Sequence, residues 1–330
     1  MNEPAISVLM TVFNAGRFFE PAIKSILAQA FRDFEFLIVD DASTDGSPDV
    51  AQAWAAKDGR LRVVRNNENK GQTACLNQGL RLARGKWTAR QDADDLTHPL
   101  RLAKQHQFVV SNPGIVLLGT NGRIIDEHSR LAGLLDAPLT LESITWTAPF
   151  LNPFMHTSVL FRTDVIRDQF EGYNDAYRIA QDYELWTRVV ARHDAANLPE
   201  RLVSYRHLPT SLSKSESSAA FAEADQISAR EARRAFGRGL SDGESDLIAS
   251  FRRGLDPGKR RQFWKLYSRL LSERKPRPAD LGRTVAMHHL KAAGAFSPKA
   301  LGPALEEILV ALRSDPAATL GWLAARYLTA

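Results

Sequence analysis

The sequence predicts an α/β protein: a mixed, mostly parallel sheet flanked by helices, followed by a C-terminal helical region. Three observations lead to this fold class. Short apolar runs alternate with segments of helical periodicity over the first part of the chain. Acidic residues directly follow several of those runs, at the strand ends where parallel sheets bind ligands. After a serine-rich stretch, 210–218, the chain is rich in Ala, Arg, Leu and Glu and is interrupted by prolines, which favours short helices.

The first part of the chain alternates between the two periodicities. Apolar runs predict strands at 5–13, 34–39, 61–65 and 86–90. Apolar residues at helical spacing predict helices at 18–27, 50–56 and 72–84, and a further helix opened by Pro99. Strand, helix, strand in this order is typical of parallel strands joined by crossover helices.

The later elements continue the pattern up to the serine-rich stretch. Strands are expected at 115–119, 122–125, 158–162 and 198–205, with a helix at 181–192. We therefore expect a first domain over residues 1–213 and a basic α-helical region over 214–330.

Composition narrows the class of protein. At 330 residues, 44% hydrophobic and 25% charged, the chain is an ordinary globular protein of about two domains. The single cysteine, Cys75, excludes an internal disulfide. No apolar stretch is as long as a membrane span, and the start shows no basic leader or cleavage site. These features predict a cytoplasmic location.

Charge is unevenly distributed. From Lys214 onward there are 20 Lys and Arg against 13 Asp and Glu, with Phe263, Trp264 and Tyr267 among the basic residues. Such a region suits the anionic inner face of a membrane, where a lipid-linked acceptor would lie. The alternative is a solvated helical surface packed on the first domain. We expect no nucleic-acid partner, because no nucleic-acid-binding motif is found.

Acidic groups follow three of the apolar segments: Asp40-Asp41, Asp92-Ala93-Asp94 and Asp182 with Glu184. One such residue is usually a turn or helix-capping residue. Three groups at one edge of a sheet would concentrate negative charge, which a cation or a proton must neutralise. Mg²⁺ and Mn²⁺ prefer carboxylate oxygens and bridge them to phosphates. The sequence therefore predicts a metal–phosphate site.

The residues around these groups resemble family 2 glycosyltransferases of the GT-A fold. The resemblance covers about residues 5–213 and rests on four blocks in order: SVLMTVFNAGRFFEPAIKSILAQAFRDFEFLIVDDASTDGS, NNENKGQTACLNQGLRLARGKWTARQDADD, NPFMHTSVLFR and GYNDAYRIAQDYELWTRV. It implies a Rossmann-like sheet and an inverting, metal-dependent hexosyl transfer from a nucleotide-sugar, commonly a UDP-sugar. Residues 214–330 match nothing that we can name.

The resemblance also implies roles for individual residues. Asp182 would be the catalytic base. Asp94 would bind the divalent cation, Mn²⁺ or Mg²⁺, with Asp92 facing the ribose or the metal's water shell. The nucleotide-sugar site would be formed by Thr11, Val12, Phe13 and Asn14, by Asp40 and Asp41, by Lys70 and Arg90, and by Asp92, Ala93 and Asp94.

Two positions depart from the family pattern. Gln181 stands where relatives carry Glu before the catalytic Asp, so the proton affinity of Asp182 is expected to be lower. In Tyr205-Arg206-His207-Leu208 the histidine comes one residue early. His207 is either a metal ligand or a surface residue.

The remaining candidates have weaker support. His156 and Trp186 fit the acceptor side, but each has an alternative role, His156 as a buried histidine and Trp186 as a core residue. Lys70 either holds donor phosphates or lies in a helix-entry turn, and Arg90 either pairs with a carboxylate or reaches the donor. Cys75 is expected to be inert packing.

Three functional classes follow from these observations. The first is an inverting glycosyltransferase that adds one sugar to a glycan or lipid-linked acceptor during surface polysaccharide assembly. The alternatives are a nucleotidyltransferase and a non-catalytic nucleotide-sugar-binding protein. A nucleotidyltransferase would carry a Gly-rich, basic loop after the first strand, whereas this chain has Phe13-Asn14-Ala15-Gly16-Arg17. A non-catalytic protein would have lost Asp94 or Asp182, and both are present.

Overall fold

The computed structural model describes residues 3–208, 217–237, 240–253, 255, 257–274, 284 and 288. The chain divides into two compact units, one formed by 1–131 with 154–208 and the other by 132–153 with 209–330. The predicted boundary after residue 213 falls outside the described residues, so the domain limits stay a prediction. The assignment of 132–153 to the second unit was not expected from the sequence.

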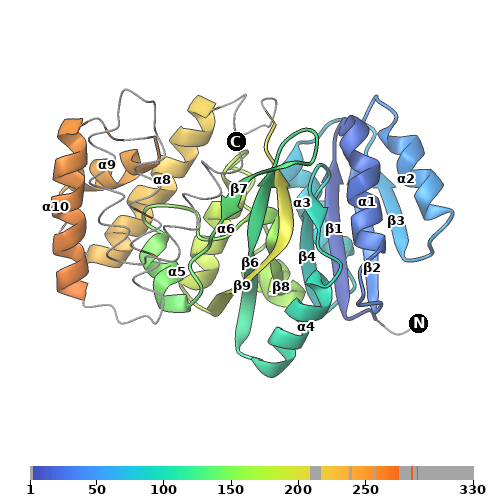
Figure 1. The fold of residues 1–330 in the computed structure, drawn as a ribbon, viewed down its shortest axis with the longest axis horizontal. Helices are drawn as coiled ribbons and strands as arrows, with labels where there is room; N and C mark the ends of the chain where they lie inside the picture. Colours follow the sequence, from blue (N-terminus) through green and yellow to red (C-terminus); the bar gives the residue numbers. More distant parts are fainter. Residues whose placement is uncertain are drawn as a thin grey trace. The chain divides into compact units, whose positions relative to one another are not determined.

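The first unit is the α/β part (Figure 1). Its strands are β1 (Ile6–Val12), β2 (Phe34–Asp40), β3 (Leu61–Arg65), β4 (Trp87–Asp92), β5 (Leu96–Thr97), β6 (Ile115–Ile125), β8 (Leu160–Arg162) and β9 (Asp194–Arg206). Its helices are α1 (Phe19–Leu27), α2 (Ser47–Ala55), α3 (Gln72–Leu82), α4 (Arg101–Ser111) and α6 (Gln181–Val190), with the short turns η1 (Gly16–Phe18), η2 (His156–Ser158) and η3 (Val165–Gln169).

The strands of this unit follow the order β3-β2-β1-β4-β8-β6-β9-β5. The pairs β1–β2, β1–β4, β2–β3 and β6–β9 are parallel, whereas β8 pairs antiparallel with both β4 and β6, and β5 with β9. The predicted mixed, mostly parallel sheet is thus confirmed. Because β1 lies centrally between β2 and β4, the residues that follow these three strands meet at one edge of the sheet.

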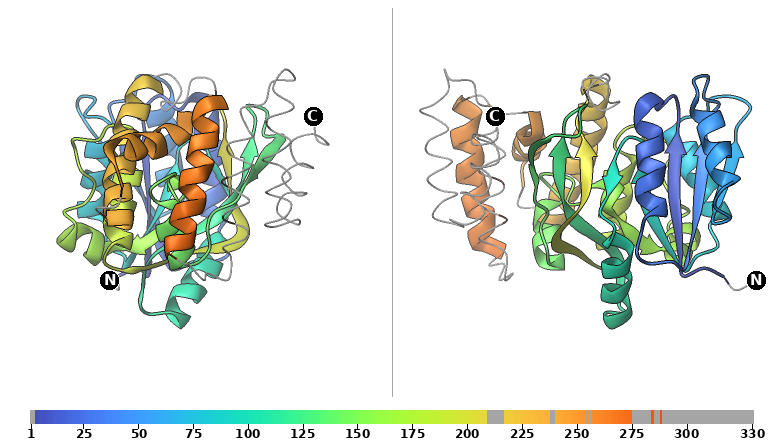
Figure 2. Two further views of the ribbon diagram at one scale, coloured as in Figure 1. Left: turned by 90° about the vertical axis from the view of Figure 1, so that its left-hand side faces the viewer. Right: turned by 45° about the vertical axis from the view of Figure 1, so that its right-hand side comes forward.

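Helices cover both faces of the sheet (Figure 2). On one face, Ile6, Val8 and Met10 of β1 form a core with buried residues of α1, α2 and α4. On the other face, Leu9 lies so close to α3 that a side chain at Gly79 would collide with it. Side chains of a strand point alternately to its two faces, so the continuous apolar run of β1 serves both layers.

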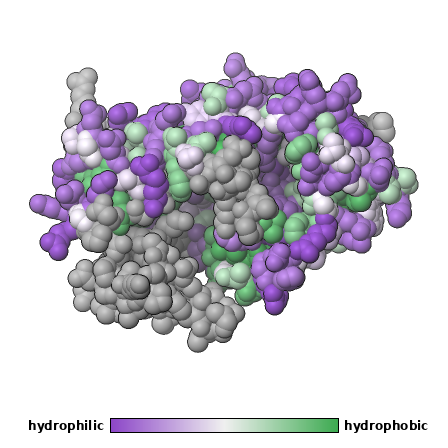
Figure 3. Space-filling model, turned by 90° about the horizontal axis from the view of Figure 1, so that it is seen from above, coloured by the Kyte–Doolittle hydropathy of each residue, from purple (hydrophilic) through white to green (hydrophobic). Residues whose placement is uncertain are grey.

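The parallel strands begin near the N-terminus and run upward in Figure 1. Their carboxyl ends and the connecting loops therefore lie at the top of that view. Seen from above, the described residues of this face are mainly hydrophilic, with smaller hydrophobic areas (Figure 3). This is the edge at which the sequence places its acidic groups.

Two predicted elements differ in the structure. The segments expected as separate strands around Gly119 and Gly122 form one continuous strand, β6. Side chains at these glycines would collide with Phe154 and Met155, respectively, so the glycines allow close packing and do not end the strand. The strand predicted at 158–162 is shortened to β8 by the turn η2.

The second unit is helical in its described C-terminal part, as predicted. It contains residues 132–135 of β7 (Leu131–Leu135), α5 (Leu141–Thr147), α8 (Ser217–Phe236), α9 (Asp242–Ser250), η5 (Phe251–Arg253) and α10 (Pro257–Arg274). Its core is aromatic, and the Trp146 indole N–H donates to the Tyr267 hydroxyl at 2.8 Å. Phe263 and Tyr267 are 0% and 2% exposed, so these aromatic residues serve the core and not a membrane surface.

Within the described part of the chain, no helix has the length and apolar composition needed to cross a bilayer.

Candidate active site

The candidate site begins at the carboxyl ends of three adjacent strands. Thr11 of β1 pairs in register with Asp92 of β4, and Val12 pairs with Asp40 of β2. Neighbouring strands are about 5 Å apart, so the loops after β2 and β4 lie about 10 Å from each other across β1. Of the segment predicted to line a nucleobase pocket, Thr11 and Val12 are buried, whereas Phe13 is 51% exposed.

The loops after β1 and β2 are tied together by Asn14. Its side-chain oxygen accepts the backbone N–H groups of Thr44 and Asp45, and its own N–H donates to the Ser43 hydroxyl. Asn14 has a φ of 51°, a left-handed conformation that asparagine tolerates better than most residues. Asp45 also accepts from the Gly16 N–H, so it acts as a loop residue, as expected.

Asp40 lies completely buried below these loops. Its carboxylate accepts the Ser43 N–H at 3.1 Å and faces the Arg65 guanidinium at 3.2 Å. Asp40 therefore holds the loop after β2, and its place in the nucleotide-sugar site stays a prediction.

Asp41 is 3% exposed and has donors on both oxygens. Oδ1 accepts from the Asn66 side chain and the Lys70 N–H, and Oδ2 from the Gly71 N–H. Burial by itself raises the pKa of Asp41, but hydrogen bonds, including one from Cys75, outweigh it and lower that pKa. Asp41 therefore anchors the loop that leads into α3.

Cys75 is buried, as expected for inert packing, but it also contacts the Asp41 carboxylate, which was not expected. Its sulfur accepts from the Asn66 side chain at 3.3 Å. Burial and the neighbouring Asp41 raise the pKa of the thiol to about 12, so it stays protonated. No sequence pattern predicts this contact, because it joins residues from three separate segments.

The side chain of Lys70, a predicted donor-site residue, is exposed.

The Asp92-Ala93-Asp94 turn follows β4 directly. Asp92 accepts from the Arg90 guanidinium at 2.6 Å, so the prediction that Arg90 pairs with a carboxylate is confirmed. Burial and the charge of Asp92 raise the pKa of Asp94 to about 6. Asp95 is completely buried, and burial raises its pKa well above the usual range. The turn thus concentrates negative charge where little water reaches it.

Two buried arginines that the sequence did not reveal hold this turn. Arg206 donates from Nε to the Asp94 carbonyl at 2.8 Å, and its own N–H donates to the Asp95 carboxylate. Arg101 donates to the carbonyls of Arg90 and Val159. Both residues act on main-chain atoms of distant segments, which no sequence pattern predicts.

The turn η2 connects the Asp-x-Asp turn to the acceptor side. The Thr157 hydroxyl accepts the Asp92 N–H at 3.2 Å. The neighbouring His156 lies with Nε2 3.1 Å from the Tyr173 hydroxyl. Burial, then the charge of Arg90, lower the pKa of His156 well below its usual value, so the imidazole is neutral. Its partner is thus a side-chain hydroxyl and not the backbone.

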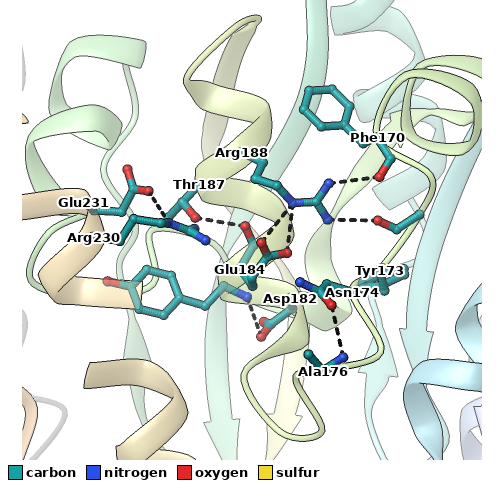
Figure 4. A network of polar contacts seen from close by, with 12 residues as sticks. Phe170, Tyr173, Asn174, Ala176, Asp182, Glu184, Thr187, Arg188, Arg230 and Glu231 are labelled. Atoms are coloured by element: carbon teal, nitrogen blue, oxygen red, sulfur yellow. Dashed lines mark hydrogen bonds and ion pairs between the residues drawn. The ribbon is translucent and has the colours of Figure 1, made fainter. Parts of the chain in front are cut away.

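Asp182 is the second residue of α6 and is partly exposed (Figure 4). Its Oδ1 accepts the Tyr183 N–H at 2.7 Å. Two residues further along α6, Glu184 forms an ion pair with Arg188, whose guanidinium also donates to the carbonyls of Phe170 and Gly172. These bonds fix the segment before α6 against the helix that carries Asp182.

Tyr173 connects the turn η2 with the segment that leads to Asp182. Burial is the main cause that raises the pKa of its hydroxyl. Nε2 of His156 lies 3.1 Å from this hydroxyl, and the neighbouring Thr157 accepts the Asp92 N–H. Contacts of η2 therefore link the Asp-x-Asp turn to the segment that precedes α6.

Trp186 does not belong to this site. It is 0% exposed, and rings of Phe154, Phe161 and Tyr173 pack around it. The prediction that Trp186 stacks on an acceptor sugar is therefore wrong, and its alternative role in the core is confirmed.

His207 is exposed, and its N–H donates to the Ile125 carbonyl.

A divalent cation fits the donor set of the Asp-x-Asp turn in part. Among the residues that the structure describes, no three Asp, Glu, His or Cys side chains are grouped so as to hold a metal ion, so His207 does not complete such a group. The raised pKa of Asp94 nevertheless marks uncompensated carboxylate charge. Two carboxylates suit a hard cation that takes its other ligands from substrate phosphates and water.

Comparisons with known proteins point to one family. The profile described as "Glycosyl transferase family 2" matches residues 7–168. The O-antigen biosynthesis glycosyltransferase WbnJ of Escherichia coli is 32% identical over 235 residues, which are 68% of this chain and 88% of WbnJ. Matches to two further relatives, from Haemophilus influenzae and Bacillus subtilis, span 66% of those proteins, slightly less than two thirds.

Solved structures share the fold. TarS 1–349 of S. aureus, in complex with UDP-GlcNAc, gives a TM-score of 0.58 at 15% identity, with 97% of this chain and 90% of that one covered. The mannosyltransferase PcManGT of Pyrobaculum calidifontis, in complex with GDP-Man and Mn²⁺, gives 0.52 at 20% identity, covering 98% and 86%. With the relatives above, these comparisons confirm the GT-A fold, and the chain belongs to glycosyl transferase family 2.

Proposed function

We propose that the protein transfers one sugar, with inversion, from a nucleotide-sugar to an acceptor hydroxyl. The observation that supports this is that two contacts of η2, Thr157 with Asp92 and His156 with Tyr173, link the Asp-x-Asp turn to the segment that leads to Asp182. An inverting transfer needs a base on one side of the anomeric carbon and stabilisation of the leaving diphosphate on the other. We infer that Asp182 and the Asp-x-Asp turn lie at one site and supply both.

A nucleoside diphosphate sugar, by preference a UDP-sugar, is the proposed donor. Phe13 is the exposed residue at the end of β1 and would face the base, beside the loops held by Asn14 and Asp40. Asp41 would bound the base pocket, although its oxygens already accept N–H groups of the protein. The UDP-GlcNAc in the TarS complex supports a uridine nucleotide, whereas the GDP-Man in the PcManGT complex supports a guanosine nucleotide.

Asp94 would bind a divalent cation, and Asp92 would contact its water shell or the ribose. When bound, Mn²⁺ or Mg²⁺ would neutralise the departing diphosphate, which then needs no proton. The Mn²⁺ in the PcManGT complex supports this choice for a protein of the same fold. Arg90, bonded to Asp92, holds that carboxylate in one orientation.

Asp182 would take the acceptor proton. As the acceptor oxygen bonds to the anomeric carbon, the bond from that carbon to the diphosphate breaks and the hydroxyl proton moves to the carboxylate. The neutral neighbour Gln181 adds no charge that would raise the proton affinity of this base. The neutral His156, whose Nε2 lies 3.1 Å from the Tyr173 hydroxyl, would contact the acceptor.

The proposed acceptor is a growing surface polysaccharide or a lipid-linked glycan, in line with the name of WbnJ. Contact with the inner face of a membrane would then involve exposed basic residues of α10, Lys259, Arg261 and Lys265. Flotation of the whole chain with phosphatidylglycerol vesicles tests this. Loss of binding after reversal of these three charges supports the contact, and equal non-binding to phosphatidylcholine and phosphatidylglycerol vesicles contradicts it.

A panel of nucleotide-sugars with Mn²⁺, screened by thermal shift and then by product analysis, tests the reaction. We expect one donor to stabilise the protein, because a bound ligand adds to apparent stability. The anomeric configuration of the product should be opposite to that of the donor. Asp182→Asn should abolish transfer and keep donor binding, whereas Asp94→Asn should weaken Mn²⁺-dependent binding. Pyrophosphate release from a nucleoside triphosphate would instead indicate a nucleotidyltransferase.

A further inference from the structure

The segment between η3 and Asp182 is held by side chains of α3, a helix from the donor half of the site. Asn77 forms a two-bond pair with the backbone of Tyr173: its Oδ1 accepts the Tyr173 N–H at 2.8 Å and its Nδ2 donates to the Tyr173 carbonyl at 2.9 Å. The Nδ2 group also donates to the Asp175 carboxylate at 3.2 Å. The Asn77 amide thus makes the pair of backbone hydrogen bonds that a neighbouring strand would otherwise make with this segment.

Two more residues of α3 extend this contact toward the base. The Thr73 hydroxyl donates to the Tyr177 carbonyl at 3.0 Å, and Gln72 accepts from the Gln181 side chain at 3.1 Å. Thr73 and Gln181 are 7% and 2% exposed, so these bonds are shielded from water. Hydrogen bonds that water does not compete for hold a backbone more firmly than exposed ones.

Position 172 requires glycine if Asn77 is to pack against it. Its φ is +79°, and a Cβ atom there would lie 2.5 Å from Asn77 Oδ1. Both conditions require glycine. Arg188 of α6 also donates to the Gly172 carbonyl, at 3.0 Å. Asn77 of α3 and Arg188 of α6 therefore both hold the backbone at residues 172–173, in the segment that leads to Asp182.

The other end of α3 belongs to the donor half. The N–H groups of Lys70 and Gly71, directly before the helix, are held by Asp41. The helix has 11 residues and spans about 16 Å. Gly79 fixes it against Leu9 of β1. One rigid element therefore connects the loop at Asp41 to the segment that carries the base.

We propose that Asn77 is a positioning residue for the catalytic base, and that α3 sets the placement of Asp182 relative to the donor. This inference rests on the proposed function. Asn77 touches neither the Asp-x-Asp turn nor Asp41 through any bond described here, so its loss should leave donor binding intact. A base displaced by about 1 Å can cost about 100-fold in rate.

The test compares Asn77→Ala with Gln78→Ala, a matched control one residue along the same helix and partly exposed. For Asn77→Ala we expect kcat for transfer to fall by about 10- to 100-fold, with the Kd of the donor and Mn²⁺ unchanged. Hydrogen exchange of the peptide covering 172–181 should accelerate, whereas the control should match the wild type in all three measurements. Thr73→Val, which removes one hydroxyl, provides a milder variant if Asn77→Ala does not fold.

A double-mutant cycle isolates the contact. Gly172→Ala places its methyl group against the Asn77 amide, so its effect on exchange and kcat should be smaller in the Asn77→Ala background. Unchanged exchange over 172–181 in Asn77→Ala would overturn the positioning contact, whether or not the wild type transfers a sugar. Faster exchange with unchanged kcat, or a parallel loss of donor affinity, would overturn the catalytic part. Failure of the wild type with every donor would refute the proposed function alone.

Discussion

Replacing Asp94 by Asn should stabilise the metal-free protein at neutral and alkaline pH. Burial and the adjacent Asp92 charge raise the pKa of Asp94 to about 6, from an ordinary value of 3.8. A difference of one pKa unit corresponds to ~1.4 kcal/mol, so ionised Asp94 costs the folded state about 3 kcal/mol. For a unit of this size that corresponds to a Tm increase of about 5–10 °C in Asp94→Asn.

The sign of the pH dependence follows from linkage. Between pH 3.8 and about 6 the folded state binds more protons at Asp94 than the unfolded state does, so its contribution to stability is lost as pH rises through this range. The advantage of Asp94→Asn should therefore be full above about pH 6 and vanish below about pH 4. Calorimetry in EDTA across this range measures it, with Glu68→Gln as the control for loss of one exposed carboxylate.

Mn²⁺ provides the complementary measurement. Added with nucleotide, it should raise the Tm of the wild type and leave Asp94→Asn nearly unchanged. If Asp94→Asn in EDTA is no more stable than the wild type at about pH 8, or if its advantage is the same at about pH 4, the buried charge at Asp94 is not what limits stability, and our account of the turn is wrong.

Three further outcomes are expected. Gly79→Ala should destabilise the first unit by about 1–2 kcal/mol in urea unfolding, because overpacking against the buried Leu9 exceeds the gain in helix propensity; a more stable variant would contradict this. Tyr267→Phe should cost the second unit about 1–3 kcal/mol, since the buried Trp146 N–H loses its acceptor. Arg206→Gln should lower Tm by about 10 °C and weaken Mn²⁺-dependent nucleotide binding, because the Asp94 carbonyl of the Asp-x-Asp turn loses a buried charged donor. Unchanged nucleotide binding would show that Arg206 contributes only to stability.

The elements that the sequence predicted are those in which periodicity and burial agree. β1 and β2 are mainly apolar, and both strands are buried at every position. The helix that carries Asp182 was recognised because its apolar residues recur at helical spacing. The missed strand β5 has only two residues and is defined by its pairing with β9, which a local pattern does not contain.

The same distinction separates the parts of the site. Asp92, Asp94 and Asp182 occur in motifs, so the resemblance to a family located them. The residues that hold them in place do not occur in motifs that we recognised. Asn77 bonds to main-chain atoms almost a hundred positions away, and Arg206 to the Asp94 carbonyl 112 positions away. Every residue has a main-chain carbonyl, whatever its type. The sequence therefore does not indicate which carbonyl a given side chain will contact.

Different arginines hold the backbone of the Asp-x-Asp turn and pair with its carboxylates. Of the three buried arginines there, Arg90 pairs with the Asp92 carboxylate, whereas Arg101 and Arg206 donate from their side chains to main-chain carbonyls near the turn. A guanidinium bound to a carbonyl fixes geometry and still contributes a favourable field, but it does not form a direct ion pair that would neutralise Asp94. Burial and the charge of Asp92 keep the pKa of Asp94 raised, despite the charges of Arg206 and Arg90. Ionised Asp94 therefore lowers the free energy of unfolding, and the same unpaired charge makes its carboxylate a suitable ligand for a divalent cation.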